Sequence, residues 1–298
     1  MSRKSFKDIL QELGFDVKRE FAILWKEFYG AIEDQFPRAI YMCTSSRIRQ
    51  DHSLAYLCQD NFAIFPTSIR KTYRNLFDYD SACNITFASL SSWKLPIPDF
   101  DTYLLLCEYI ATMLKGLRST NVLPASDISL LVSPSIQQVY DSLSGCGYTM
   151  IEQDCVCQAV PNDIGAIEAA KSVDKALCTD IMRYGHRSLK GNIDGKRAVL
   201  NSVCHHLEAK RDVLTSLSPR IASALFNIAN QLDVRHNNMA PESPKYKPFA
   251  GSLTEGQLEH WYDNLYQLCI ASILALECDG ALEEYKVNQE EMNKGRGN

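Results

Sequence analysis

Residues 219–241 read PRIASALFNIANQLDVRHNNMAP, a helical pattern followed by a dense polar turn. In the first half of this stretch, Ile221, Leu225, Ile228 and Leu232 recur at spacings of four, three and four residues. This spacing places the four apolar side chains on one face of an α-helix, as in an amphipathic helix that packs on a core. The stretch therefore predicts a helix that ends in the polar turn.

A second helical pattern follows that turn. Spacings of three and four residues separate Leu258, Trp261, Leu265, Leu268, Ser272 and Ala275. The end of this pattern, residues 268–276, is apolar almost all round, which predicts a helix buried in a core. Two long helices with a polar turn between them therefore organise the C-terminal part of the chain.

The polar side chains of the first helix also share one face. At about 100° per residue, one arc of the helix holds Asn227, Asn230, Gln231, Arg235 and Asn238. A solvated face normally carries Lys and Glu, whereas amides with a single arginine indicate the lining of a cleft. The alternative is that Asn237 or Asn238 takes the left-handed cap position and that the polar cluster only ends the helix.

Composition limits the classes of function. The chain has 298 residues, 46% of them hydrophobic, which is enough for one large or two ordinary domains. The formal net charge is −5, so no global basic field indicates nucleic-acid binding, and any such site must be a local patch. No apolar run approaches a membrane span and no signal-peptide core is present, so we expect a cytoplasmic protein without a membrane partner.

Cysteine usage gives no indication of a metal or cofactor. There are 11 cysteines, an odd number, at irregular spacings and without a CxxC motif. In the absence of a secretion signal, most are expected to be reduced, small core residues. Cys155 and Cys157 lie two apart on one face of an expected strand and Cys146 is nearby, but the local sequence supplies no fourth zinc ligand. We therefore predict no cofactor and no metal.

The rest of the chain predicts a mostly α protein with one small β-hairpin near residues 148–160. The best candidate for a domain boundary is the polar stretch 118–126. We therefore predict a helical N-terminal domain of unknown type over residues 1–122, and a hairpin plus a helical bundle over residues 123–298. Within the latter, one helix is expected from about Asp194 to Leu217, and the tail after Asp279 is expected to fray.

Histidines add few candidates outside the polar turn. His205 and His206 point about 100° apart on their helix, so they cannot chelate one metal as an i, i+4 pair would. His186 lies in a polar segment, residues 184–191, and is a candidate substrate-binding residue. As an alternative, His186 or His206 could carry a proton, and the only carboxylates near them in sequence are Glu208 and Asp212.

Two long helices joined by the Arg235-His236-Asn237-Asn238 turn, followed by the segment Trp261–Tyr266, resemble the C-terminal part of bacterial abortive-infection proteins. In outline, residues 174–277 are similar to HEPN domains, which are bundles of four or five helices. Many active HEPN proteins are metal-independent RNA endonucleases that pair across a dimer cleft. The resemblance therefore implies a defence-associated ribonuclease or nucleic-acid-directed toxin that acts on RNA as a homodimer.

The HEPN motif is an arginine, usually followed by a polar residue, with a histidine after four to six intervening residues. Arg235 matches the arginine by its placement, and Asn237 takes the polar role. Positions 240–242 are Ala, Pro and Glu, so the histidine of the motif has no counterpart at the usual distance and His236 is the candidate that replaces it.

The resemblance then implies the roles of the turn. His236 would act as the base for the ribose 2′-OH and Arg235 as the clamp on the scissile phosphate. Asn237 would assist catalysis, and Asn238, Gln231 and Asn227 would bind substrate. The alternative is a non-catalytic interaction module, in which the bundle dimerises or binds a protein partner of a defence system.

Overall fold

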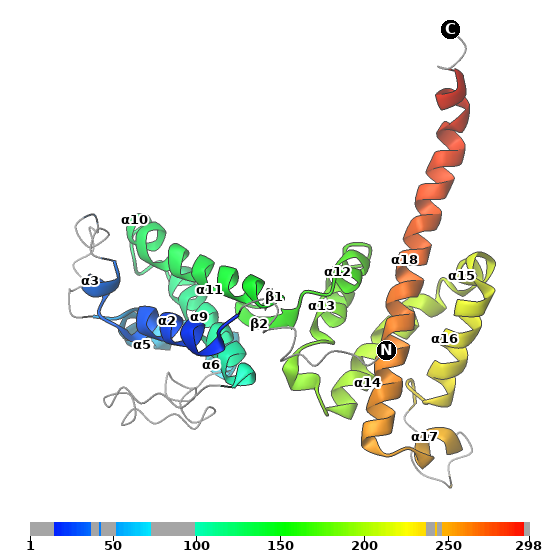
Figure 1. The fold of residues 1–298 in the computed structure, drawn as a ribbon, viewed down its shortest axis with the longest axis horizontal. Helices are drawn as coiled ribbons and strands as arrows, with labels where there is room; N and C mark the ends of the chain where they lie inside the picture. The colour runs from blue at the N-terminus through cyan, green and yellow to red at the C-terminus, as the bar shows by residue number, and fades with distance from the viewer. Residues whose placement is uncertain are drawn as a thin grey trace. The chain divides into compact units, whose positions relative to one another are not determined.

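The computed structural model (Figure 1) describes the backbone of residues 15–36, 42, 52–72, 99–236, 242 and 246–294. Over these ranges the chain is mostly helical with one two-stranded antiparallel sheet, which confirms the predicted class. The chain divides into two compact units, Met1–Asn162 and Asp163–Asn298. Each unit has a hydrophobic core of its own.

The described elements of the first unit surround one helix, α9. They are α2 (Val17–Tyr29), α3 (Ile32–Gln35), α5 (Leu54–Asn61), the 3-10 turn η1 (Phe62–Ile64), α6 (Thr67–Thr72), α9 (Phe100–Ser119), α10 (Ala125–Asp127), the π-helical turn η2 (Ile128–Val132), α11 (Ser133–Gly145), β1 (Tyr148–Gln153) and β2 (Val156–Pro161). Helix α9 is buried on nearly every side from Tyr103 to Leu117. Helices α2, α5 and α11 and strand β2 pack around it, so α9 forms the centre of this core.

The predicted hairpin is present. Strands β1 and β2 pair antiparallel from Tyr148 opposite Pro161 to Gln153 opposite Val156. The turn between them uses Asp154 and Cys155 at φ 52° and 67°. Two consecutive residues with positive φ are typical of the tight type I′ turn, whose twist matches that of the paired strands.

The hairpin belongs to the first unit, contrary to the predicted domain layout. The N–H of Cys157 donates to Thr112 Oγ1 at 3.0 Å, and the N–H of Ala159 donates to the Glu108 carboxylate at 2.9 Å. Two side chains of α9 thus satisfy the outer edge of β2, which would otherwise carry unpaired donors. The boundary predicted between residues 122 and 123 falls inside this unit, and the division lies between residues 162 and 163.

We expect Glu27→Gln to stabilise the protein at neutral pH. Burial in the first core raises the pKa of the Glu27 carboxyl, although a hydrogen bond from Ser135 offsets part of this shift. A raised native pKa means that stability falls as the pH rises from the unfolded pKa, about 4.5, through the native value. Thermal melts should show a higher midpoint for the glutamine variant than for the wild type at neutral pH. This difference in midpoint should disappear in acid. A difference in midpoint that does not change with pH would contradict this account.

The described elements of the second unit surround α18. They are α12 (Ile164–Lys171), α13 (Lys175–Arg183), the 3-10 turn η3 (Arg187–Leu189), α14 (Ile193–Glu208), α15 (Arg211–Leu217), α16 (Pro219–Gln231), α17 (Pro248–Ser252) and α18 (Glu255–Lys294). Helices α12, α14, α15 and α16 pack on α18. Leu265, Cys269 and Ile273 of α18 are buried at the centre of this core, as the apolar pattern of the last helix predicts.

Two predictions about helix ends in this unit were wrong. The single helix expected over residues 194–217 is two helices, because the chain turns at Ala209 and Lys210, where the Lys210 N–H donates to the Leu207 carbonyl at 3.0 Å. The turn lays α15 against α16. The last helix does not end near Asp279 but continues to Lys294.

A buried ion network joins α14 to α18. Lys196 Nζ lies 2.6 Å from Asp263 Oδ1 and 2.9 Å from Glu259 Oε1, and the Lys196 side chain is only 8% exposed. The hydroxyl of Tyr184 donates to the same Asp263 oxygen at 3.0 Å. The Tyr184 ring lies under the lysine, with Nζ 5.2 Å from its centroid. These contacts fix the register of the two helices that carry most of the second core.

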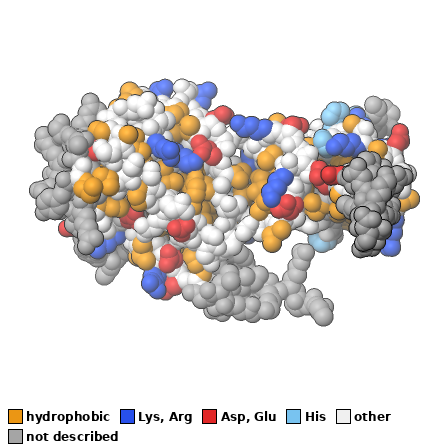
Figure 2. Space-filling model, turned by 90° about the horizontal axis from the view of Figure 1, so that it is seen from above, with side chains coloured by type: hydrophobic (Ala, Val, Ile, Leu, Met, Phe, Trp, Pro, Cys, Tyr) orange, Lys and Arg blue, Asp and Glu red, His pale blue; other side chains and the backbone are white. Residues whose placement is uncertain are grey.

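The surface is electrostatically mixed. Figure 2 shows Lys and Arg side chains interspersed with Asp and Glu over the visible face, with apolar side chains between them. In the described part of the chain, no helix combines the length and the apolar character that crossing a membrane requires.

Candidate functional site

The polar turn of the second unit begins with a well-formed helix C-terminus. The N–H of Val234 donates to the Ala229 carbonyl and the N–H of Asp233 donates to the Asn230 carbonyl, both at 3.2 Å. This pair of bonds is the Schellman motif, and Asp233 takes its left-handed position at φ 49°. Val234 is fully buried, so the backbone is anchored immediately before Arg235.

The left-handed position after α16 is taken by Asp233, whereas the alternative interpretation of the sequence placed it at Asn237 or Asn238. Asp is one of the few residues besides Gly and Asn that enters this region readily. Asn237 and Asn238 lie outside the described residues. Their predicted roles in catalysis and substrate binding stay predictions.

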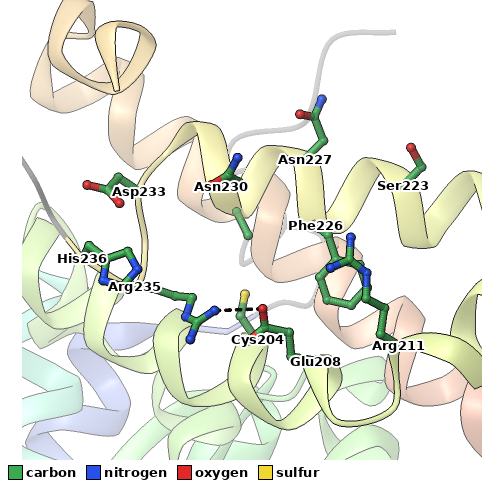
Figure 3. Close-up of a pocket in the computed structure, with 11 residues that line it drawn as sticks. Cys204, Glu208, Arg211, Ser223, Phe226, Asn227, Asn230, Asp233, Arg235 and His236 are labelled. Carbon is green, nitrogen blue, oxygen red and sulfur yellow. Dashed lines mark hydrogen bonds and ion pairs between the residues drawn. The ribbon is translucent and has the colours of Figure 1, made fainter. Parts of the chain in front are cut away.

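A cleft of about 500 Å³ opens beside this turn. Helix α14, the start of α15, one face of α16 and the turn after α16 supply its walls (Figure 3). The lining residues are Cys204, Glu208, Arg211, Ser223, Phe226, Asn227, Ala229, Asn230, Asp233, Arg235 and His236. The predicted candidates Arg235, His236 and Asn227 therefore lie on one cavity.

An ion pair lies in the middle of the cleft. Arg235 Nη1 is 2.9 Å from Glu208 Oε1, and the two side chains are 51% and 33% exposed. A pair with this exposure adds only about 0–1 kcal/mol to stability. Its effect is geometric: it holds the guanidinium over the cleft, while half of the side chain stays accessible to a ligand. A guanidinium has five N–H donors, so binding to Glu208 leaves donors for a phosphate.

The two ends of the cleft differ. In Figure 3, Asp233 and His236 lie at the end next to Arg235. At the other end the guanidinium of Arg211 lies over the Phe226 ring, 4.5 Å from its centroid. Ser223 and Asn227 point away from α14 and form the outer rim. One end therefore carries a carboxylate and an imidazole, and the other an aromatic ring covered by a guanidinium.

Two other predicted residues lie apart from the cleft. Gln231 is exposed and is not among the lining residues. His186 is 5% exposed and caps the short turn η3, where its Nδ1 accepts from the Ser188 N–H at 3.3 Å. Arg235 lies beyond the end of α16 and reaches the cleft from the turn that follows the helix.

The sequence did not indicate Glu208, Arg211 and Phe226 as members of this site. Glu208 is 27 positions from its partner Arg235, and nothing in the local pattern relates them. Arg211 reaches the cleft because the helix breaks at Ala209 and Lys210. A helix-breaking signal is weak there, since both residues are compatible with a helix.

The charges of the cleft balance. Arg211 and Arg235 each carry one positive charge, and Glu208 and Asp233 each carry one negative charge. Over the described part of the chain, no three His, Cys, Asp or Glu side chains lie close enough together to hold a metal ion. The cleft can thus offer a cation, a carboxylate and an imidazole in a small space, without a strong net field.

Comparison with known proteins gave no relative. No protein-family model matches the chain, and neither the curated proteins nor the solved structures contain a significant match.

Proposed function

We propose that the second unit is a metal-independent RNA endonuclease of the HEPN type, and that the whole protein acts in bacterial antiphage defence as an abortive-infection protein. The observation that carries the proposal is the Arg235–Glu208 ion pair, which lies beside His236 in one cleft. A further support is the architecture, because α12, α14, α15 and α16 form a bundle around α18.

The chemistry needs three groups. Cleavage through the ribose 2′-OH requires a base for the hydroxyl, a cation for the charge that develops on the phosphate, and a proton for the leaving oxygen. In our proposal His236 is the base, Arg235 binds the phosphate, and the leaving 5′-oxygen takes its proton from water. Glu208 positions the guanidinium, so the cation is in place before RNA arrives.

The motif of the family is altered in this chain, since Ala, Pro and Glu occupy positions 240–242. The proposal therefore depends on His236, which follows the arginine directly. The buried Val234 anchors the backbone next to this pair. A fixed backbone restricts the directions that the two side chains can take, which favours a defined geometry on one substrate phosphate.

We also propose that two copies act together, as the HEPN resemblance implies. A two-fold axis would bring two Arg235–His236 pairs to one RNA strand. Analytical ultracentrifugation should then show a dimer at the concentrations where the protein cleaves RNA. A monomer that retains full activity would contradict this part of the proposal.

Cleavage of RNA in the presence of EDTA tests the proposed function. Purified protein should degrade total cellular RNA when every divalent ion is chelated, and should leave DNA of matched length intact because DNA has no 2′-OH. Intact RNA at several protein concentrations would reject a nuclease.

The balanced charges of the cleft favour a second candidate, a non-catalytic module that binds a protein partner of a defence system. A phosphate-binding groove normally carries net positive charge, whereas two cations and two carboxylates suit a protein surface of mixed charge. The salt dependence of RNA binding separates the two candidates. Affinity for RNA that falls steeply with salt supports the nuclease, and an absence of RNA binding supports the module.

A further inference from the structure

The floor of the cleft contains a pair of thiols in contact. Cys204 of α14 and Cys269 of α18 have their sulfurs 3.9 Å apart, and both residues are free and buried. Cys204 also lines the cleft, and Figure 3 shows its sulfur directed toward the space that Arg235 and Glu208 border. A small molecule in the cleft therefore reaches one sulfur of the pair, while the second lies behind it.

The two sulfurs are not equivalent. The hydrogen bond with Cys204, together with complete burial, raises the pKa of the Cys269 thiol well above its ordinary value. Cys269 is fully buried behind Cys204 and does not line the cleft, whereas Cys204 does. Cys204 is thus the sulfur of the pair that an oxidant in the cleft meets first.

We propose that Cys204 and Cys269 form a peroxide-sensitive pair, in which Cys204 is oxidised and Cys269 resolves it to a disulfide that joins α14 to α18. The Cys204 thiolate attacks one oxygen of hydrogen peroxide, the O–O bond breaks, and a sulfenic acid forms with loss of hydroxide, which takes up a proton as water. The Cys269 sulfur then attacks the sulfenic sulfur, and the S–O bond breaks with release of a second water. Two thiols are oxidised to one disulfide and one peroxide is reduced to two waters.

The disulfide acts on the cleft through α14. A disulfide bond is about 2.05 Å long, so the sulfurs must close from 3.9 Å, and we expect α14 and α18 to shift against each other as the bond forms. Glu208 lies one turn after Cys204 on the same helix. Movement of that turn changes the position of the carboxylate that holds Arg235. We therefore expect oxidised protein to cleave RNA more slowly. This last step rests on the proposed function, whereas formation of the disulfide does not.

Peptide mapping tests the pair in the full chain. Protein treated with hydrogen peroxide is alkylated to trap free thiols, digested without reductant and analysed by mass spectrometry. Most molecules should yield a peptide in which Cys204 is linked to Cys269, and dithiothreitol should remove it. The exposed Cys278 reports that the oxidant was active. Alkylated, unlinked Cys204 and Cys269 in a sample where Cys278 is oxidised would overturn the inference, as would a link from Cys204 to another cysteine.

Two variants and an activity measurement complete the test. In Cys269→Ser, with Cys269→Ala as a second variant if the first fails to fold, the link must vanish and Cys204 should accumulate as sulfinic acid. RNA cleavage by the wild type should fall several-fold on oxidation and return with dithiothreitol, while any loss in the variants should not return, because dithiothreitol does not reduce sulfinic acid. If the reduced wild type does not cleave RNA at all, the proposed function fails, and the mapping still decides whether the disulfide forms.

Discussion

Arg235→Ala and His236→Ala should each reduce RNA cleavage in EDTA by roughly a hundred- to a thousandfold, the usual effect of removing a group that stabilises charge or transfers a proton in the transition state. Both side chains are exposed in the second unit, so neither change should lower the thermal midpoint by more than a small amount. The measurement is the initial cleavage rate of each variant, together with its melting curve.

Matched controls make this result specific. Arg220 is an exposed arginine at the start of α16, the helix that precedes the Arg235 turn, and His205 is an exposed histidine on α14. Neither lines the cleft. Arg220→Ala and His205→Ala should keep wild-type rates. If Arg235→Ala unfolds the protein, the arginine is a structural clamp on the end of α16, and the catalytic interpretation is wrong.

The second large effect is on stability. Lys196→Met should destabilise the second unit by about 2–3 kcal/mol, because it leaves two carboxylates at the end of a buried network without their cation. The value lies below the roughly 3–5 kcal/mol that breaking a fully buried pair costs, since the Asp263 side chain is 51% exposed and regains water. Chemical denaturation, with the slope and midpoint both fitted, measures the change.

The exposed pair of Lys171 and Glu168 provides the control. Their charged atoms are 2.7 Å apart, but the side chains are 65% and 52% exposed. Lys171→Met should therefore cost less than about 1 kcal/mol. If the two methionine variants lose the same free energy of unfolding, the Lys196 network adds no more stability than an ordinary surface pair.

The same network predicts a loss of stability in acid. The hydrogen bond from the Gly191 N–H, followed by Lys196, lowers the pKa of the Glu259 carboxyl. A lowered native pKa gives a contribution that is complete above the unfolded pKa, about 4.5, and is lost as the pH falls through the native value. Lys196→Met should reduce this acid dependence. Parallel profiles of stability against pH for the two proteins would contradict the assignment.

Local patterns in the sequence predicted the elements whose signals are local. Helix α16 follows from the spacing of its apolar residues, and the hairpin follows from two short apolar runs around Asp154. Asn227 and Arg235 were predicted as site residues because amides and an arginine share one helical face, and His236 was predicted from the HEPN resemblance. The structure brings these three to one cleft.

What the sequence could not give depends on contacts between distant residues. Nothing near Glu208 indicates that its carboxylate binds Arg235. The hairpin appeared to belong with the C-terminal helices because it is close to them in sequence, but Thr112 and Glu108 of α9 bind its outer edge. The adjacency of Cys204 and Cys269, which are 65 positions apart, likewise comes only from the packing of α14 on α18.

The chemical form of the product ends tests the central claim most directly. A short RNA of defined sequence is incubated with wild-type protein in EDTA, and the fragments are analysed by mass spectrometry. If His236 activates the ribose 2′-OH beside Arg235, the upstream fragments must end in a 2′,3′-cyclic phosphate or its hydrolysis product, and the downstream fragments must begin with a 5′-hydroxyl. Fragments with 3′-hydroxyl and 5′-phosphate ends, or RNA that stays intact, would contradict the account.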